Sequence, residues 1–546
     1  MRLLLAPLIA AGLVAATSPG TRVVVALPPG IVGDASGRLL LFAVPATAKN
    51  ADSDAVDVDS DGVSVAAQDV AGFGPAGSVT MDTQAIAFPE SFAALKGEYR
   101  VQAVLDRDAS YNYGGRGPGD LASKVVTVRF PLASVPVIPL DHALPPEAGP
   151  FDVAGLPPVA AEQITASRPH LHDERIASRL LTRFHGSSQS VAAWVLTPPG
   201  YDPRSRTTYP TVYTAGGFGT THKLDGQTLS KQWHLMETGV IPPMIWVALD
   251  FATPTGTTEF ADSANNGPWG RALIDEVIPT LERRYRMDAR PSGRFLTGHS
   301  SGGWFALWTI VHYPALFGGS WPTSPDPSDF HDFIGVDLYA PGANMYHDAA
   351  GAPRPLERDD GEVRETIEQH VRMETVLGRE GGQFRAFDWV FSPRRADGSP
   401  AFLFDRRTGA IDPKVAAYWH DHYDISHRIE ADWPRLRTDL DGKIHLTVGA
   451  ADSYYLDGSV HRLEAAVHRV GGRADFTYVP KATHSMTQVY ARDGDRNALW
   501  KDMTHAMVAI ARATPEADNS PRSEANFAGH VRPETEPDRT LNQNRR

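Results

Sequence analysis

The chain has 546 residues, too many for one ordinary domain, so its length predicts two or more domains. Hydrophobic residues make up 42% of the chain and charged residues 21%, as is normal for a globular protein, and the absence of cysteine excludes disulfides and thiol catalysis. The formal net charge of −13 argues against a nucleic-acid partner, because proteins that bind such polyanions usually present a basic surface.

Residues 1–18 are typical of a secretory signal peptide. Arg2 supplies one positive charge, an apolar run extends from Leu3 to Ala16, and small residues precede Ser18. The run is shorter than the roughly 20 apolar residues that cross a bilayer, so we expect no stable membrane span once the segment is removed. A retained N-terminal anchor is the alternative. We therefore expect a secreted or periplasmic protein.

Residues 20–150 are expected to form an all-β, sandwich-like domain. Short β-rich runs alternate here with Gly, Pro, Asp and Asn, and no helical periodicity of useful length interrupts them. The runs are Val23–Leu27, Arg38–Val44, Tyr99–Leu105 and Lys124–Phe130. The Pro-rich stretch from Val135 to Pro158 is predicted to be a linker.

Asp57–Gly62, within this domain, imitates the start of a calcium-binding loop, in which alternating carboxylates converge on the ion. Gln68 stands at the twelfth position, where such loops carry Glu, and the pattern predicts no flanking helices. A solvated acidic turn is therefore the preferred interpretation.

Residues 165–512 show a different pattern, in which strands alternate with helices. This alternation predicts a mostly parallel sheet with helices on both faces. The expected strands are Ser190–Leu196, Thr211–Thr214, Met244–Asp250, Arg294–Thr297, Lys443–Val448 and Asp475–Val479. The expected helices are Ala272–Tyr285, Ser301–Tyr313 and Leu456–Val470. A segment from about 324 to 440, rich in charge, Pro and aromatics, is predicted to be an insertion over the C-terminal edge of the sheet, and residues 513–546 a disordered tail.

The most informative segment is Gly298-His-Ser-Ser-Gly302, a GxSxG pentapeptide. In this motif the serine lies on a sharp turn from strand to helix, where side chains two positions before and after it would collide. The amides and the positive dipole end of the following helix then face a developing oxyanion. Because the motif follows an apolar strand and opens an apolar helix, we predict Ser300 to be a nucleophile.

A serine hydroxyl needs a base, and a fold with this turn orders its catalytic residues as Ser, acid and His. His484 lies in a loop just after the last predicted strand, where the base is expected, and His505 on the final helix is the weaker candidate. Asp452 ends a predicted strand and is favoured as the acid. Two alternatives are Asp457, which a helix N-terminus also explains, and Asp326, which follows the preceding strand.

The oxyanion of such a reaction needs two backbone donors. The loop Gly216–Gly219 follows an early strand, so we predict the amides of Phe218 and Ser301 as these donors. A plain glycine turn is the alternative.

Two further groups of residues have open interpretations. Asn265, Asn266 and Trp269 are candidates for lining a substrate cleft, with turn and capping roles equally open. His420 and His422 would share one face of a strand, as a metal pair does, but no third ligand is evident and their aromatic neighbours indicate packing. No metal is expected.

Taken together, these pieces resemble the putative esterase family, which includes esterase D, enterochelin esterase, feruloyl and acetyl-xylan esterases and the mycolyltransferases. The similar segments are Tyr209–Tyr213 with the glycine loop, Asp275–Pro279 with Tyr285-Arg286, Thr297–Gly303, Val448–Asp452 and Thr483-His484. The resemblance spans about 190 to 510 and implies an α/β-hydrolase fold that acts on esters. One departure is Gly216-Gly217, where family members usually carry His-Gly. The segment Gly97–Leu105 is similar to a β-domain that accompanies some of these esterases.

The predicted function is hydrolysis of a carboxylic ester through a covalent acyl-enzyme, with no cofactor. The substrate is expected to be a small-molecule or carbohydrate-linked ester, because fold and motif do not define its acyl and alcohol parts. An acyltransferase of the same fold and a non-catalytic binding protein are the alternatives. The oligomeric state is left open.

Overall fold

The computed structural model describes residues 21–513 apart from 28–34, 50–55, 57–61, 74–76, 109–113, 147–148, 150, 222–225, 379, 381, 486–491 and 493. The predicted signal peptide, most of the acidic turn at Asp57–Gly62 and the predicted tail from 514 onward lie outside the described residues. The chain divides into two units, Met1–Pro146 with Thr375–Arg379 and Glu147–Glu374 with Glu380–Arg546.

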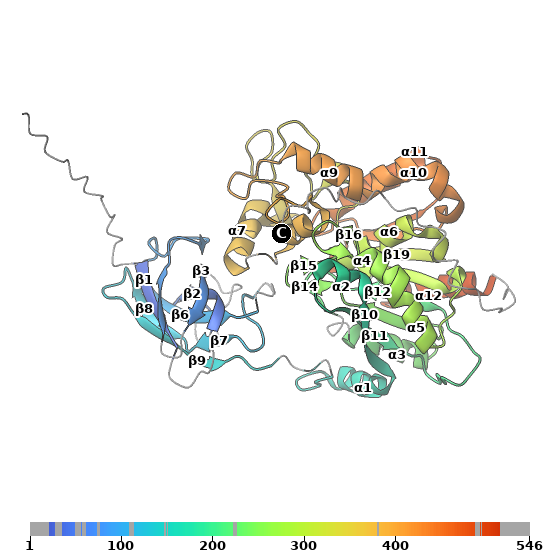
Figure 1. Cartoon of the computed structure of the whole chain (residues 1–546), viewed down its shortest axis with the longest axis horizontal. Helices are drawn as coiled ribbons and strands as arrows, with labels where there is room; N and C mark the ends of the chain where they lie inside the picture. The colour runs from blue at the N-terminus through green and yellow to red at the C-terminus, as the bar shows by residue number, and fades with distance from the viewer. Residues whose placement is uncertain are drawn as a thin grey trace, which may run out of the picture. The chain divides into compact units, whose positions relative to one another are not determined.

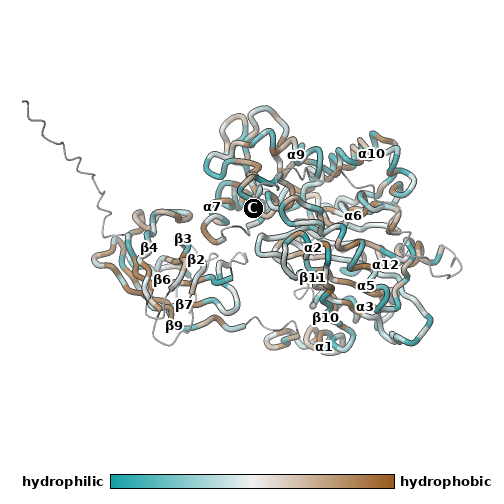
Figure 2. The backbone as a smooth tube through the Cα atoms, viewed as in Figure 1, coloured by the Kyte–Doolittle hydropathy of each residue, from teal (hydrophilic) through white to brown (hydrophobic). Residues whose placement is uncertain are grey.

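The first unit is built from β-strands (blue in Figure 1), and hydrophobic stretches recur along them (Figure 2). Its strands are β1 (Arg22–Ala26), β2 (Ala35–Pro45), β3 (Ser64–Phe73), β4 (Ser78–Asp82), β5 (Ala87–Phe88), β6 (Gly97–Asp106), β7 (Leu121–Ser123), β8 (Val126–Phe130) and β9 (Val137–Ala143). They pair in the order β4-β1-β9-β7-β6-β2-β3-β5, with β8 also on β6. Val25, Leu41, Val101 and Ile138, from four of these strands, belong to one buried core.

The predicted linker from Val135 to Pro158 is wrong in its first part, because β9 lies within it. Ile138 and Leu140 are buried while Val137 and Pro139 are exposed, so the segment follows the period-two pattern of a strand. β9 pairs parallel to β1 and antiparallel to β7, despite a proline that cannot donate to the ladder. The proline content had masked this alternation.

The second unit contains an eight-stranded sheet in the order β10-β11-β13-β12-β18-β19-β22-β23. Its strands are β10 (Leu171–Ser178), β11 (Gln189–Leu196), β12 (Thr211–Ala215), β13 (Ile245–Leu249), β18 (Arg294–His299), β19 (Gly319–Thr323), β22 (His445–Gly449) and β23 (Asp475–Val479). The pairings from β13 through β23 are all parallel, and the two at the β10 edge are antiparallel. The carboxyl ends of the parallel strands therefore meet at one edge, the position of binding sites in such sheets.

Helices cover both faces of this sheet (Figure 1), because its strands are apolar on both sides. In β13, Val247 belongs to one core, whereas Trp246 and Ala248 belong to the other. The first core includes residues of α2 (Arg179–His185), α6 (Ser301–His312), α10 (Ile425–Leu440) and α11 (Leu456–Arg469). The second includes residues of α3 (Gly226–Glu237) and α12 (Ala498–Ala513), and α1 (Pro158–Ser167) precedes the sheet.

The predicted helix Ala272–Tyr285 is divided into three pieces. α4 (Trp269–Ala272) leads into a π-helical turn (Leu273–Val277) and then into α5 (Ile278–Arg284). Pro279 lacks an amide N–H, so it cannot supply the regular helical hydrogen bond at this point. The amide of Ile278 donates to the carbonyl of Leu273, five residues back, which accommodates the interruption.

The segment between β19 and β22 contains most of the remaining helices. It includes a two-stranded sheet of β20 (Pro355–Asp359) and β21 (Glu362–Thr366), followed by α7 (Ile367–Leu377), α8 (Gln383–Phe391), α9 (Pro413–Tyr423) and α10. Two short hairpins, β14–β15 (Ala252–Thr253 with Gly256–Thr257) and β16–β17 (Asp262–Ser263 with Gly267–Pro268), follow β13. Among the described residues, no helix combines the length and apolar character needed to cross a membrane.

His370 on α7 is held between two carboxylates. Its Nδ1 lies 2.9 Å from Glu365 Oε2, and its Nε2 lies 3.3 Å from Glu374 Oε1. Burial disfavours the charged imidazole, but the hydrogen bonds and charges of these two glutamates outweigh it and raise the pKa of His370 to about 10.

This cluster predicts a pH-dependent contribution to stability. A pKa raised in the folded state means that charged His370 stabilises fully below its unfolded pKa of about 6.5. That contribution is lost as the pH rises through about 10. Thermal unfolding of wild type and His370→Gln should therefore differ most near pH 6 and converge near pH 10. A difference that is constant across this range would contradict the assignment.

Candidate active site

Ser300 lies at the turn between β18 and α6, in the strained geometry that the motif predicts. Its backbone has φ 59° and ψ −123°, a region that residues with a side chain rarely occupy. Its amide donates to Thr323 O at 3.1 Å, and its carbonyl accepts from Trp304 N at 3.0 Å and from Asp326 N at 3.2 Å. These hydrogen bonds to β19, to α6 and to the segment after β19 hold the turn in place.

The two glycines of the motif are required by close backbone contacts. A Cβ on Gly298 would lie 2.1 Å from Gly302 O, and a Cβ on Gly302 would lie 2.0 Å from Ala215 O. Neither position has room for a side chain, because the ends of β12 and β18 and the start of α6 meet there. The steric reason predicted from the sequence therefore applies to this turn.

His484 and Asp452 are hydrogen-bonded to each other. His484 Nδ1 lies 2.9 Å from Asp452 Oδ2, and Asp452 is fully buried with 0% of its surface exposed. Burial opposes ionisation of Asp452, but the hydrogen bond and charge of His484 and the amide of Tyr454 hold its pKa below the ordinary value. Asp452 can thus accept the Nδ1 proton of His484 and leave Nε2 as the imidazole's acceptor.

The other candidate residues have different partners. Asp457 receives a hydrogen bond from Arg358 Nη2 at 3.0 Å, and Arg358 Nε donates to the backbone carbonyl of Asp452 at 2.9 Å. Asp457 therefore supports the Asp452 turn through an arginine. His505 lies on the exposed side of α12, with its Nδ1 2.7 Å from Lys501 O.

Asp326 lies beside the Ser300 turn. Its Oδ2 accepts from Ser301 Oγ at 2.6 Å, and its Oδ1 accepts from Ser300 Oγ at 3.4 Å. Among the described residues, Asp326 is the hydrogen-bond partner of the Ser300 hydroxyl, and no hydrogen bond joins Ser300 to His484. The structure therefore brings His484 to Asp452 and Ser300 to Asp326.

His299 directly precedes Ser300 and lies next to His484, and it was not singled out from the sequence. Its ring centroid lies 4.5 Å from that of His484. Burial, with the charge of His484, lowers the pKa of His299 to about 3, so this imidazole is neutral at ordinary pH. Thr323 Oγ1 donates to Gly298 O at 3.0 Å and lies 3.0 Å from His299 Nδ1, which makes Nδ1 the donor to Thr323. The only sequence signal was its place in the pentapeptide next to Ser300.

The glycine loop after β12 lies against Ser300. A Cβ on Gly217 would lie 3.3 Å from Ser300 Cβ and 3.8 Å from its Oγ. Thr220 N donates to Gly217 O at 3.2 Å, and Gly219 has φ 77°, so the segment forms a tight turn. This position places Phe218 and Ser301 on the two chain segments that flank the Ser300 side chain.

Asn265, Asn266 and Trp269 are buried and bonded mainly to protein backbone. Asn265 Nδ2 donates to Ser392 O at 2.8 Å, and Trp269 Nε1 donates to Asn266 O at 3.0 Å. Asn266 Nδ2 donates to Thr257 O at 3.4 Å. These contacts are those of turn residues, the alternative considered from the sequence, and the substrate-binding role stays a prediction.

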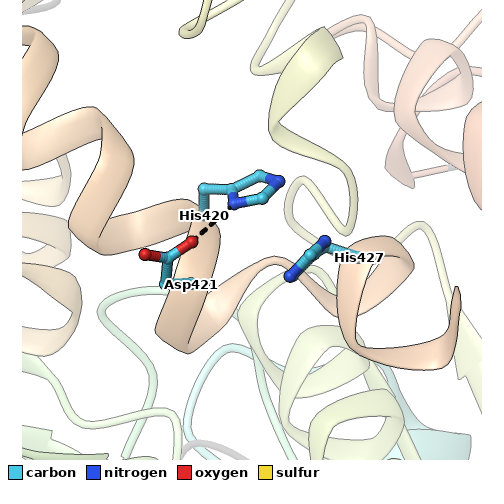
Figure 3. Close-up of side chains that lie close together, drawn as sticks. All are labelled: His420, Asp421 and His427. Atoms are coloured by element: carbon cyan, nitrogen blue, oxygen red, sulfur yellow. Dashed lines mark hydrogen bonds and ion pairs between the residues drawn. The ribbon is translucent and has the colours of Figure 1, made fainter. Parts of the chain in front are cut away.

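The histidines at 420 and 422 lie on a helix, α9, so the prediction that they share the face of a strand is wrong. The helix instead places His420 near Asp421 and His427 (Figure 3), with possible ligand atoms within 4.8 Å of one another. His422 is stacked on Tyr418. Asp421 Oδ1 lies 2.8 Å from His420 Nδ1, so this carboxylate already pairs with one of the two imidazoles.

A cavity of about 560 Å³ lies in the segment between β19 and β22. Its lining includes Arg395, Phe402 and Lys414 and none of Ser300, Asp452 and His484. This cavity is therefore separate from the candidate active site.

Residues 188–383 match the family model described as "Putative esterase". The resemblance predicted from the sequence is thereby confirmed. This family implies an α/β-hydrolase fold, and the match identifies the activity as carboxylic ester hydrolysis. Ser300 lies within the matched residues, whereas Asp452 and His484 lie beyond them.

Individual proteins are similar to the chain at low identity. The Bacillus subtilis (strain 168) protein named "Uncharacterized protein YbbA" is 24% identical over 196 residues, which cover 33% of this chain and 72% of that protein. A ferulic acid esterase structure has a TM-score of 0.37 at 12% identity, covering 63% of this chain and 98% of its own. An S-formylglutathione hydrolase from Agrobacterium tumefaciens has a TM-score of 0.34 at 14% identity, covering 63% and 94%.

The close contact at Gly302 predicts a severe effect of adding one methyl group. A Cβ 2.0 Å from Ala215 O and 2.6 Å from Gly216 O must displace backbone on which the Ser300 turn rests. We expect Gly302→Ala to lose about 1–3 kcal/mol of unfolding free energy, as overpacked sites do, and to lose most ester hydrolysis. Gly149→Ala is the matched control, since a Cβ there meets nothing within 4 Å. If Gly302→Ala kept the stability and the activity of the wild type, the turn would not be constrained as described.

Proposed function

We propose that Ser300, His484 and Asp452 act as a catalytic triad that hydrolyses a carboxylic ester through a covalent acyl-enzyme. The hydrogen bond of 2.9 Å between His484 Nδ1 and the fully buried Asp452 carries this proposal. A buried, ionised aspartate at Nδ1 favours the tautomer whose Nε2 accepts a proton and stabilises the imidazolium that results. The strained backbone of Ser300, at the end of β18, supports its role as the nucleophile.

In the first half of the reaction, Ser300 Oγ forms a bond to the carbonyl carbon of the ester and its proton passes to His484 Nε2. The tetrahedral intermediate then expels the alcohol, which takes the proton from His484. In the second half, water gives a proton to His484 and attacks the acyl-enzyme, releasing the acid and restoring Ser300. Catalysis requires the Ser300 proton to be accepted by His484 rather than by Asp326, its partner in the resting structure.

The amides of Phe218 and Ser301 are the proposed donors to the oxyanion. Ser301 is the first residue of α6, so its amide is one of those that the helix itself leaves unpaired. The contact of Gly217 with Ser300 supports the glycine loop as the second source. Two amides and a helix N-terminus would stabilise the negative charge that develops on the carbonyl oxygen.

The substrate is proposed to be a small-molecule or carbohydrate-linked ester. Neither the acyl group nor the alcohol follows from the triad, since specificity depends on the pocket around it. A panel of p-nitrophenyl esters of increasing chain length, together with feruloyl and acetyl sugar esters, would define the acyl part.

The proposed role of Ser300 as the nucleophile can be tested by covalent labelling. A fluorophosphonate probe should label the wild-type protein, and Ser300→Ala should abolish both labelling and p-nitrophenyl acetate hydrolysis, with a loss on the order of 10³-fold or more in kcat. Ser292→Ala is a matched control for serine removal outside the turn. Persistent labelling of Ser300→Ala would identify another nucleophile, and failure of the wild type to react would favour a non-catalytic protein.

The proposed role of Asp452 as the acid can be tested by an isosteric substitution. Asp452→Asn should keep the fold but lower kcat by roughly 10³–10⁴-fold, because an amide at this position favours the wrong tautomer of His484. Asp457→Asn should have a much smaller effect, since Asp457 is hydrogen-bonded to Arg358 and not to His484 among the described residues. Steady-state hydrolysis of a short ester distinguishes the two variants. Equal losses would mean that Asp452 has no special role.

A further inference from the structure

Glu259 is a fully buried carboxyl group close to the nucleophile turn. It has 0% of its surface exposed and lies in the loop Thr257–Phe260, whose four residues are all fully buried. Among the described residues, no hydrogen-bond donor reaches either Oε1 or Oε2 of Glu259. The group that faces its carboxyl is the carboxyl of Asp326. A buried acid with only another acid beside it needs a physical explanation.

The loop holds Glu259 in an unusual backbone conformation. Glu259 and Phe260 both have φ 48°, in the left-handed region that residues with a side chain rarely adopt. Glu259 N donates to Thr257 Oγ1 at 3.1 Å and Ala261 N donates to Thr258 O at 3.0 Å, so local hydrogen bonds support the conformation. Such outliers persist where the surroundings require them and cluster at functional sites.

The loop is also packed against the helix that follows Ser300. The ring of Phe260 lies 5.3 Å from that of Phe305 on α6, between centroids. Asp326, with 3% of its surface exposed, donates its amide to Ser300 O and accepts from Ser300 Oγ and Ser301 Oγ. Asp326 is therefore the residue that links Glu259 to the Ser300 turn.

Two carboxyl groups in contact inside a protein cannot both be ionised, so the pair holds one proton. Asp326 has hydroxyl donors on both oxygens and faces His484, and each of these favours its ionised form. Glu259 has no comparable donor among the described residues. Glu259 therefore holds the shared proton and can donate a hydrogen bond to the Asp326 carboxylate.

We propose that neutral Glu259 donates a hydrogen bond to the Asp326 carboxylate, and that this one-proton pair is a positioning device for the Ser300 turn. Glu259 and Asp326 are positioning residues, because they act on the ester through Ser300 and Ser301. The inference rests on the proposed function of Ser300.

The directions in which the pKa values of Glu259 and Asp326 are shifted agree with this arrangement. Burial, with the charge of Asp326, raises the pKa of Glu259 well above its ordinary value. Burial also raises the pKa of Asp326 to about 6, although the hydroxyl of Ser301, the charge of His484 and the hydroxyl of Ser300 oppose this shift. The charge of Asp452 acts in the same direction as burial. Asp326 is then ionised above about pH 6, the state in which it accepts both hydroxyls.

The test compares two substitutions at Glu259 that differ mainly in hydrogen bonding. Glu259→Gln keeps an N–H donor toward Asp326, and Glu259→Met fills similar volume without one. We expect Glu259→Gln to be at least tenfold more active than Glu259→Met in kcat for a p-nitrophenyl ester, with similar KM. The acid limb of the kcat profile should move to higher pH in Glu259→Met, because an Asp326 without its donor binds a proton more readily.

The outcomes separate this inference from the proposed function. Equal activity and equal pH profiles for the two Glu259 variants would overturn the positioning role. Loss of labelling in Ser300→Ala would, in that case, still leave Ser300 as the nucleophile. Labelling of Ser300→Ala would overturn the proposed function itself. Should Glu259→Met fail to fold, Asp326→Asn provides the second measurement. In the kcat–pH profile of Asp326→Asn, the step near pH 6 should disappear, and an unchanged acid limb would contradict the inference.

Discussion

The candidate site depends on a backbone crossing that has no room for side chains. The end of β12, the end of β18 and the first turn of α6 meet where Gly298 and Gly302 lie, and an added Cβ at either glycine would lie about 2 Å from a carbonyl oxygen. This crossing forces Ser300 into a positive φ and aims its side chain out of the turn. It also brings Gly217 of the β12 loop within contact of Ser300. One steric constraint thus positions both Ser300 and the glycine loop.

The electrostatics of the site follow from how each buried acid is compensated. Asp452 has an imidazole and a backbone amide, and its pKa is lowered despite burial. Asp326 accepts hydrogen bonds from two hydroxyls, and burial still raises its pKa to about 6. Glu259 lacks a donor among the described residues, and burial raises its pKa well above the ordinary value. Three carboxyls of the same chemical type therefore have different protonation behaviour, set by the number of donors that each one meets.

Much of this arrangement could be predicted from the sequence because its determinants are local. The sequence itself contains the alternation of the strands, the GxSxG spacing and the order of Ser300, Asp452 and His484. The strand β23 (Asp475–Val479) has the predicted bounds. The hydrogen bond between His484 and Asp452 spans 32 residues but was accessible because each residue follows its own strand. The strand within the predicted linker was missed because proline content outweighed a short alternation.

The contacts that the sequence did not predict are those made between loops. Glu259 lies in a segment with no motif, and its position beside Asp326 depends on a backbone conformation that propensities do not predict. His420 and His427 come together only because α9 and α10 are joined by a tight connection, and the strand assumed for His420 and His422 gave the wrong pairing. Asp326 was weighed as an acid for His484, and its hydroxyl partners emerge only from the structure.

The central claim is that one hydroxyl, at a glycine-flanked turn, carries the acyl group during turnover. The most direct measurement is tandem mass spectrometry of peptides from protein quenched during hydrolysis of a slowly deacylated ester. We predict an acyl adduct on Ser300, at less than one equivalent per chain, that is lost on further incubation. An adduct on a different side chain, or steady hydrolysis with no adduct on Ser300 at any quench time, would contradict it.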